Sequence, residues 1–290
     1  MAMTVSDFFS KLGATIKSVV KICLQSRPGH IKGVPGGRSL IIMANGPSLN
    51  DTIEQSLDTL QTNDTLSVNF APNSEKFSQL RPKYHVLADP LFFSKDAPRN
   101  VVQLYESLSA VNWPLTLLVP KKNKNDLPRE VIENKNISVE VFNFVGAEGF
   151  DWFENLVYGH ECAMPRPRNV LIPAIMCGIW LGYKDLYVTG ADHSWMRTIS
   201  VDSDNNVISV QPHFYKDDKS EQKRVDTTYR NYKLHDIVYS FYVAFRSYHR
   251  VARFACNRGV KIFNSTPGSY IDAFPRKGLP LALRVKPSLK

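Results

Sequence analysis

This sequence of 290 residues has few cysteines and no long apolar runs. Its four cysteines, Cys23, Cys162, Cys177 and Cys256, include no Cys-x-x-Cys pair, so no zinc or dithiol motif is predicted. A chain of this length needs no disulfides for stability, which favours reduced thiols and a cytoplasmic protein. No run of 18 apolar residues occurs, and lysines interrupt the apolar residues near the N-terminus. We therefore expect neither a membrane-spanning helix nor a secretory signal peptide.

Two phosphate-binding signatures are also missing. The chain contains neither the Gly-x-Gly-x-x-Gly nor the Gly-x-x-x-x-Gly-Lys-Ser/Thr pattern, which disfavours a dinucleotide site and a P-loop. What the chain does have is an ordinary globular composition, 43% hydrophobic and 22% charged, with a net charge of +9. Such a surplus attracts nucleic acid, anionic membranes and phosphorylated ligands alike, so charge alone does not select a partner.

Short apolar runs alternate with helix-like segments along most of the chain. The runs expected to form strands are residues 39–44, 65–69, 84–88, 115–120, 137–142, 185–190 and 260–263. The clearest helical segments are residues 98–110, 169–182 and 229–257, of which the second is apolar almost all round, as in a buried helix. This alternation predicts an α/β fold with a Rossmann-like, mostly parallel sheet and flanking helices.

Two segments lie outside this alternation. In residues 5–25 the apolar side chains recur every three or four positions, which predicts an amphipathic helix, and a Gly- and Pro-rich linker follows. Residues 195–228 contain a hairpin turn at 202–206 and then a polar stretch. We therefore expect residues 1–37 to form the helix and linker, and residues 38–290 to form a single α/β domain with a lid-like insertion at 195–228.

Polar side chains directly follow several of the predicted strands. They are Asn45, Gly46, Pro47 and Ser48 after the first strand, Asn69 and Asp89 after the next two, Asp192 and His193 after the sixth, and Ser265 and Thr266 after the last. Ligands of open α/β sheets bind at the carboxyl ends of strands, so these residues are expected to share a cleft. Gly46 allows the backbone to approach a ligand closely, and Ser48 is able to cap a helix or donate to a phosphate. A plain strand-to-helix turn with a serine cap is the alternative for this loop.

Five segments, in order, resemble one family. Residues 45–49 (Asn-Gly-Pro-Ser-Leu) resemble the signature of the bacterial lipooligosaccharide sialyltransferases, whose relatives include a family similar to archaeal hydroxymethylpterin pyrophosphokinase. Residues 68–70 resemble the family's second strand end, and residues 89–93 its Asn-Pro-x-x-Phe-Phe segment, with Asp89 in place of Asn. Residues 181–192 are similar to its strand leading to a Gly-x-Asp, and residues 264–269 to its closing Pro-containing turn.

This resemblance implies a glycosyltransferase that moves a sialic acid or Kdo-like sugar from a CMP-activated donor to a surface glycan or glycolipid, without a metal cofactor. The donor-binding residues it implies are Asn45, Gly46, Pro47, Ser48, Asn69, Asp89, Asn169, Ser265 and Thr266. The catalytic candidates are His235, Asp192 and His193. In the family, tyrosine hydroxyls hold the phosphate and a histidine takes the acceptor's proton, a role that suits a side chain with a pKa of about 6.5.

The sequence departs from the family around the phosphate. Ser194 stands where a family tyrosine is expected, and the tyrosines that are alternatives are Tyr215, Tyr229 and Tyr232. His235, before the long helix, is the preferred base, with His213 as the second choice. His193 is a base, a phosphate donor or a structural residue. Asp192 anchors the ribose, holds local backbone or acts as a nucleophile in a retaining mechanism, and these alternatives stay open.

Other functions are weighed against this one. Asp202 and Asp204 have the Asp-x-Asp spacing of metal-dependent glycosyltransferases, but they lie in the expected hairpin rather than at a strand end, so no metal site is predicted. One alternative is an ATP- and magnesium-dependent phosphotransferase similar to the pterin pyrophosphokinase. Another is a basic membrane- or nucleic-acid-binding module. Aromatic residues are not interleaved with clustered basic ones, so we expect no nucleic-acid partner.

The helix at residues 5–25 predicts a membrane partner. Lys11, Lys17 and Lys21 lie off its apolar stripe, which is the pattern of a helix lying in an anionic membrane interface. We therefore expect a protein that is peripheral on the inner membrane. The alternative is a helix packed on the protein's own core or on a partner subunit, which leaves a homo-oligomer open.

Overall fold

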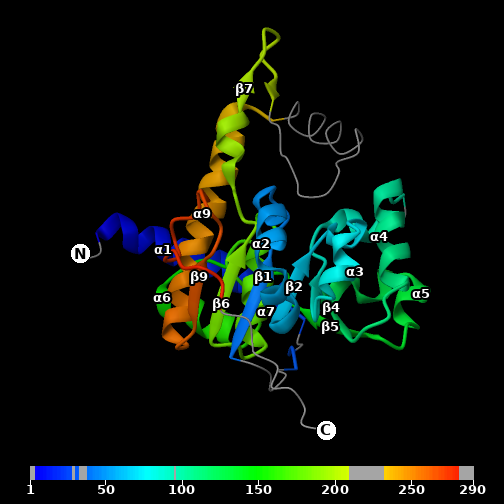
Figure 1. The fold of residues 1–290 in the computed structure, drawn as a ribbon. Helices are drawn as coiled ribbons and strands as arrows, with labels where there is room; N and C mark the ends of the chain where they lie inside the picture. The colour runs from blue at the N-terminus through cyan, green and yellow to red at the C-terminus, as the bar shows by residue number, and fades with distance from the viewer. Residues whose placement is uncertain (1–3, 28–29, 33–37, 95, 209–231, 281–290) are drawn as a thin grey trace.

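A sheet of seven parallel strands forms the centre of the computed structural model, which describes residues 4–27, 30–32, 38–94, 96–208 and 232–280. The strands are β1 (Ser39–Met43), β2 (Asp64–Val68), β3 (Tyr84–Val86), β4 (Leu115–Pro120), β5 (Ile137–Phe142), β6 (Asp185–Thr189) and β9 (Lys261–Asn264). Their order across the sheet is β5-β4-β3-β2-β1-β6-β9 (Figure 1). The predicted Rossmann-like α/β fold is confirmed.

Helices cover both faces of the sheet. They are α2 (Ser48–Thr62), α3 (Lys76–Leu80), α4 (Arg99–Ser109), α5 (Arg129–Ile132), α6 (Asp151–Gly159), α7 (Leu171–Trp180) and α9 (Leu234–Asn257). Helix α1 (Val5–Gln25) packs instead against residues 146–151. The described residues also form the 3-10 turns η1 (Ala71–Asn73), η2 (Pro90–Phe93), η3 (Lys121–Asp126) and η4 (Ser194–Thr198). A small antiparallel hairpin of β7 (Ser200–Val201) and β8 (Val207–Ile208) stands apart from the sheet (Figure 1).

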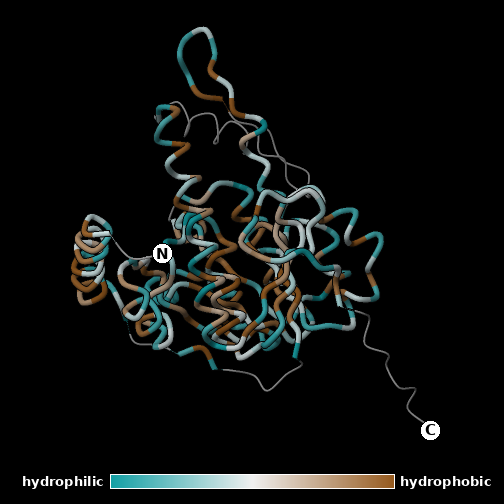
Figure 2. Tube along the Cα trace, turned by 90° about the vertical axis from the view of Figure 1, so that its left-hand side faces the viewer, coloured by the Kyte–Doolittle hydropathy of each residue, from teal (hydrophilic) through white to brown (hydrophobic). Residues whose placement is uncertain are grey.

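Alternating side chains of each strand enter two separate hydrophobic layers. In β1, Leu40 and Ile42 belong to the layer under α6, α7 and α9, while Ile41 and Met43 belong to the layer under α2, α3 and α4. Burial on both faces explains why the strands read as continuous apolar runs rather than as alternating ones. Figure 2 shows the hydrophobic residues concentrated in the middle of the molecule.

The strand order places a switch point between β1 and β6. From β1 the chain builds outward through β2, β3, β4 and β5, and it then returns to add β6 and β9 on the other side of β1. At such a point the connections leave the sheet in opposite directions, which opens a crevice at the carboxyl ends of the two strands.

Most of the predicted elements are present at the expected residues. The N-terminal helix spans the predicted range, and the hairpin turn at 202–206 joins β7 to β8. The sequence did not predict α6, and residues 209–231, which include most of the polar part of the lid-like insertion, lie outside the described residues. In the described ranges, no helix combines the length and the apolar character needed to cross a bilayer. The division into residues 1–37 and 38–290 stays a prediction.

Candidate functional site

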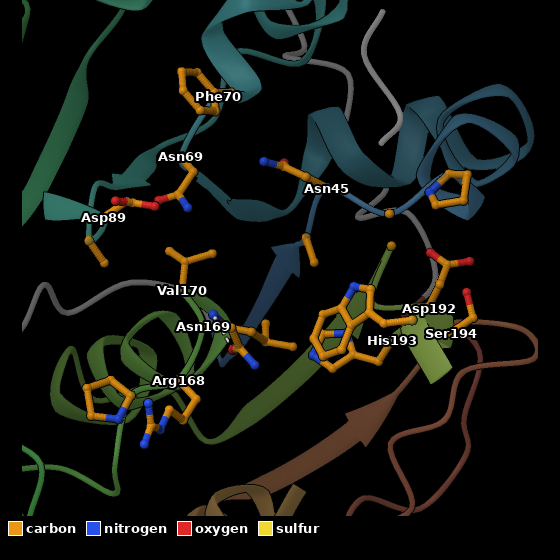
Figure 3. A pocket seen from close by; sticks show the side chains of 18 of the residues that line it. Asn45, Asn69, Phe70, Asp89, Arg168, Asn169, Val170, Asp192, His193 and Ser194 are labelled. Atoms are coloured by element: carbon orange, nitrogen blue, oxygen red, sulfur yellow. Dashed lines mark hydrogen bonds between the residues drawn. The ribbon is translucent and has the colours of Figure 1, made fainter. Parts of the chain in front are cut away.

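A cavity of about 500 Å³ lies at the switch point, over the carboxyl ends of β1, β2, β3 and β6. Its volume is in the range of small-molecule sites. Eight of the predicted site residues line it: Asn45, Gly46, Pro47, Asn69, Asp89, Asn169, Asp192 and His193. Figure 3 shows Asn45, Asn69 and Asp89 on one side of the cavity, and Arg168, Asn169 and His193 on the other. The expectation that strand ends share a cleft is therefore confirmed for seven of these residues, all but Asn169, which precedes a helix rather than following a strand.

The first loop is locked against Asp192. The Ser48 hydroxyl donates to Oδ2 of Asp192 at 2.8 Å, and the Gly46 N–H donates to the Gly190 carbonyl at 2.8 Å. A Cβ atom at position 46 would collide with both the Asp192 carboxylate and the Gly190 carbonyl oxygen. Glycine is thus needed at this position for close approach of two loops. Ser48 does not line the cavity but fixes a residue that does.

Three asparagine side chains present unpartnered polar atoms in the cavity wall. Asn45 donates its amide nitrogen to the Val68 carbonyl at 3.1 Å, so its oxygen is left as an acceptor. Asn169 uses its oxygen to accept from the Leu171 N–H and the Tyr248 hydroxyl, both at 3.0 Å, so its nitrogen is left as a donor.

Asn69 completes this set. It adopts a left-handed backbone conformation, with φ 46°, which asparagine tolerates better than most residues. Oδ1 of Asn45, Oδ1 of Asn69 and Nδ2 of Asn169 are buried, and none has a hydrogen-bond partner within the described chain. Leaving three such atoms unsatisfied is costly, and a polar ligand would satisfy them.

Two helices begin at the cavity and favour an anion there. Pro47 and Val170 are the residues that precede the first turns of α2 and α7, and both line the cavity. The helix dipole makes such helix starts favourable for negative charge. Arg168, at the rim, is the basic residue among the described lining residues. The lining also contains the carboxylates of Asp192 and Asp89. Oδ1 of Asp89 accepts a hydrogen bond from the Leu91 N–H at 2.9 Å.

His193 sits in the wall as a neutral imidazole. Its ring stacks on Trp195 with centroids 4.2 Å apart, and its Nε2 lies 2.6 Å from the Tyr248 hydroxyl. Because that hydroxyl donates to Asn169, it accepts from Nε2–H, which leaves Nδ1 with the lone pair. Burial lowers the pKa of His193 to about 3. The ring is therefore uncharged at neutral pH, with its lone pair on Nδ1.

His235 is not brought to the cavity with the other candidates. It lies in the first turn of α9, its side chain is 82% exposed, and its Nε2 is 3.4 Å from a carboxylate oxygen of Asp236. Figure 1 shows that α9 begins beside β7, beyond the edge of the sheet. Of the other residues considered for these roles, Tyr232 is exposed, and His213, Tyr215 and Tyr229 lie outside the described residues.

Ser265 and Thr266 lie behind the cavity wall rather than in it. The Thr266 hydroxyl is buried and accepts from the Ala191 N–H at 3.0 Å, next to Asp192. Oγ of Ser265 is buried and has no partner within the described residues. Neither residue lines the cavity, so the structure gives Thr266 the role of supporting the Asp192 loop.

The Asp-x-Asp pair lies in the hairpin, as predicted. Oδ1 of Asp202 accepts from the N–H groups of Asp204 and Asn206 at 2.9 and 2.8 Å, which closes the turn between β7 and β8. This carboxylate therefore has a structural use. Over the ranges that the structure describes, no group of three or more His, Cys, Asp or Glu side chains is arranged to hold a metal ion.

Sequence reasoning missed Arg168, Trp195 and Tyr248. Arg168 carried a usable signal, because it directly precedes a segment predicted to be a buried helix, and an arginine at such a helix start is a natural anion ligand. Tyr248 carried none, because it meets Asn169 and His193 only through the packing of α9 on α7.

Comparison with known proteins does not assign the chain to a family. No protein-family model and no curated protein matches the chain. Solved structures that match include the MAf glycosyltransferase from Magnetospirillum magneticum AMB-1, at 12% sequence identity and a TM-score of 0.48. That match covers 96% of this chain and 39% of the other, so the chain spans well under half of that protein's length. The functional inference therefore rests on the cavity.

Proposed function

We propose that this protein is a glycosyltransferase that transfers a sialic acid or Kdo-like sugar from a CMP-activated donor to a surface glycan or glycolipid. The observation that carries the proposal is the cavity at the switch point, whose wall contains the unpartnered amide atoms of Asn45, Asn69 and Asn169 together with two helix starts and Arg168. This combination suits a ligand with a hydrogen-bonding base or ribose next to a phosphate. The resemblance of residues 45–49, 68–70 and 181–192 to the sialyltransferases supports CMP as that ligand.

The charges in the cavity wall suit a single phosphate. One arginine and the starts of α2 and α7 supply positive potential without a metal ion, opposed by the carboxylates of Asp89 and Asp192, so the wall suits a monophosphate, which carries less charge than a diphosphate. Asn45 and Asn69 would accept hydrogen bonds from ribose hydroxyls or from an exocyclic amino group, and Asn169 would donate one. Metal independence is part of the proposal, and transfer is expected to survive chelation by EDTA.

His193 is the proposed proton acceptor in place of His235, because it lines the cavity. In the proposed step the acceptor's hydroxyl oxygen bonds to the anomeric carbon of the donor sugar. The bond from that carbon to the phosphate oxygen breaks, CMP leaves with the electron pair, and the hydroxyl proton passes to Nδ1 of His193. Negative charge on a bound donor would raise the pKa of His193 from its low resting value and so strengthen it as a base. Asp192, held by Ser48, is proposed to position the donor.

A thermal-shift screen of nucleotides tests the proposal. CMP and CDP are expected to raise the melting temperature, since a ligand at about 100 times its Kd adds roughly 2.7 kcal/mol of stability. ATP with magnesium is expected to leave it unchanged. Stabilisation by ATP with magnesium and not by any cytidine nucleotide would favour the phosphotransferase alternative. Loss of transfer in EDTA that manganese restores would overturn metal independence.

A further inference from the structure

Helix α1 is attached to the rest of the protein by its polar face. The residues it buries are Thr15 and Ser18. The Ser18 hydroxyl donates to the Glu148 carbonyl at 2.7 Å and accepts from the Glu148 N–H at 2.9 Å, and the Thr15 hydroxyl accepts from the Phe150 N–H at 3.0 Å. An amphipathic helix that serves only to cover a core would have its apolar face in this position.

Most of the large apolar side chains of α1 point outward instead, although Leu12 and Ile22 are half-buried and Ile22 packs against the core. The exposed ones, which we call the apolar stripe, are Val5, Phe8, Phe9, Ile16, Val19, Val20 and Leu24. Figure 2 shows hydrophobic colour along this helix at the edge of the molecule, near the N-terminal mark. Phe8 of the stripe packs on Phe150, with ring centroids 5.5 Å apart. In the neighbouring helix α6, Trp152 and Leu156 are also exposed, and 66% of Trp152 is accessible to solvent. Exposed apolar area of this extent on one element marks an interaction surface.

A cluster of basic residues borders the stripe. It consists of Lys17, Lys21, Arg166 and Arg168, and we call it the basic cluster. Across the described residues no carboxylate lies within ion-pair distance of any of the four. Burial lowers the pKa of Lys21, the charges of Arg166, Lys17 and Arg168 lower it further, and the Glu148 carboxylate offsets part of this. These cations repel one another, so an anion placed among them would be favourable. Because Arg168 also lines the cavity, the cluster leads from the stripe to the cavity rim.

We propose that α1 and the basic cluster dock the protein on an anionic phospholipid bilayer. The apolar stripe would enter the boundary between headgroups and acyl chains, and the cluster would meet lipid phosphates. A tryptophan beside the helix suits the same boundary, where its ring and N–H are both accommodated. A second copy of the chain fits this surface less well, since a two-fold contact would bring two basic clusters together. The proposal does not depend on the donor chemistry.

Flotation of the full chain with vesicles tests the proposal. Binding is expected to vesicles of phosphatidylcholine with phosphatidylglycerol, to weaken with salt, and to be weak with phosphatidylcholine alone. A triple variant, Phe9→Ser with Ile16→Ser and Val20→Ser, is expected to lose at least tenfold in partitioning. The matched control is Val102→Ser with Ile132→Ser, which removes exposed apolar side chains of α4 and α5 and should bind as the wild type does. All these positions are exposed, so the melting temperature should stay within a few degrees.

A charge variant keeps the test independent of the apolar substitutions. Lys17→Gln is expected to weaken binding to anionic vesicles about fivefold, whereas Lys122→Gln on η3 should change it little. The proposal is overturned if the wild type does not float with anionic vesicles, or if the triple variant floats as well as the wild type. It is also overturned if sedimentation shows a wild-type dimer that the triple variant converts to monomer while vesicle binding is unchanged. That last result would assign the stripe to a second copy of the chain.

Discussion

Acidification provides a quantitative test of the two histidines that the structure buries as neutral rings. His85 is fully buried between β2 and β4, with its Nδ1 2.8 Å from the Ser67 hydroxyl, and burial lowers its pKa to about 3, as it does for His193. The unfolded chain binds a proton at each histidine below a pH of about 6.5, whereas the folded chain does so only near pH 3. Stability is therefore complete above pH 6.5 and falls as the pH drops toward 3. At pH 5 each histidine should cost about 2 kcal/mol.

Urea denaturation at pH 7, 6 and 5 measures this effect. The wild type should lose about 4 kcal/mol from the pair between pH 7 and pH 5, in addition to whatever other groups contribute. His85→Gln and His193→Gln should each lower the stability at pH 7 but remove about 2 kcal/mol of its pH dependence. His235→Gln is the matched control, because that side chain is exposed in the folded protein. If His85→Gln and His193→Gln lose as much stability on acidification as the wild type, the two rings are not buried as neutral groups.

Three further predictions concern the cavity. Gly46→Val should cost about 1–3 kcal/mol of stability and abolish CMP binding, because the added side chain displaces the Asp192 loop. Normal CMP binding by this variant in calorimetry would contradict the geometry. Arg168→Gln should weaken CMP binding by about tenfold or more, as loss of a hydrogen bond to a charged group predicts, while Lys122→Gln should not. His193→Ala should lower turnover by about 10² to 10⁴ with little change in CMP binding, and His235→Ala should retain turnover; the reverse result would restore His235 as the base.

The sheet and one side of the site were predictable because their signals are local. A buried parallel strand is a short apolar run, and the polar residue that follows it, such as Asn45, Asn69 or Asp89, lies at the carboxyl edge by construction. The order of the strands then brings Asp192 beside Gly46 and Ser48. Periodicity, run length and fold rules were sufficient for this much.

The rest depends on contacts between residues distant in sequence. Tyr248 joins His193 to Asn169 across separate elements, which no spacing reveals. The sequence favours His235 as the base because of its place at the start of a long helix, but that helix starts beyond the sheet, and His235 in its first turn does not line the cavity.

Helix α1 shows a further limit of sequence patterns. Its periodicity predicted the helix at the right residues, but the pattern does not say which face meets the protein. That is decided by Thr15 and Ser18, whose hydroxyls complete backbone hydrogen bonds of residues 148–150.

Release of nucleotide from activated sugars measures the central claim directly. The purified full chain would be incubated with CMP-sialic acid, CMP-Kdo, UDP-glucose, GDP-mannose and ATP in EDTA and, separately, in magnesium, and the nucleotide products separated by chromatography. The proposed function predicts that CMP is released from a CMP-sugar in both buffers and that an added glycan or glycolipid acceptor increases the rate. The His193→Ala variant is expected to release CMP at least 10²-fold more slowly than the wild type. Release of UDP or GDP, or consumption of ATP only in magnesium, with no CMP from either CMP-sugar, would contradict it.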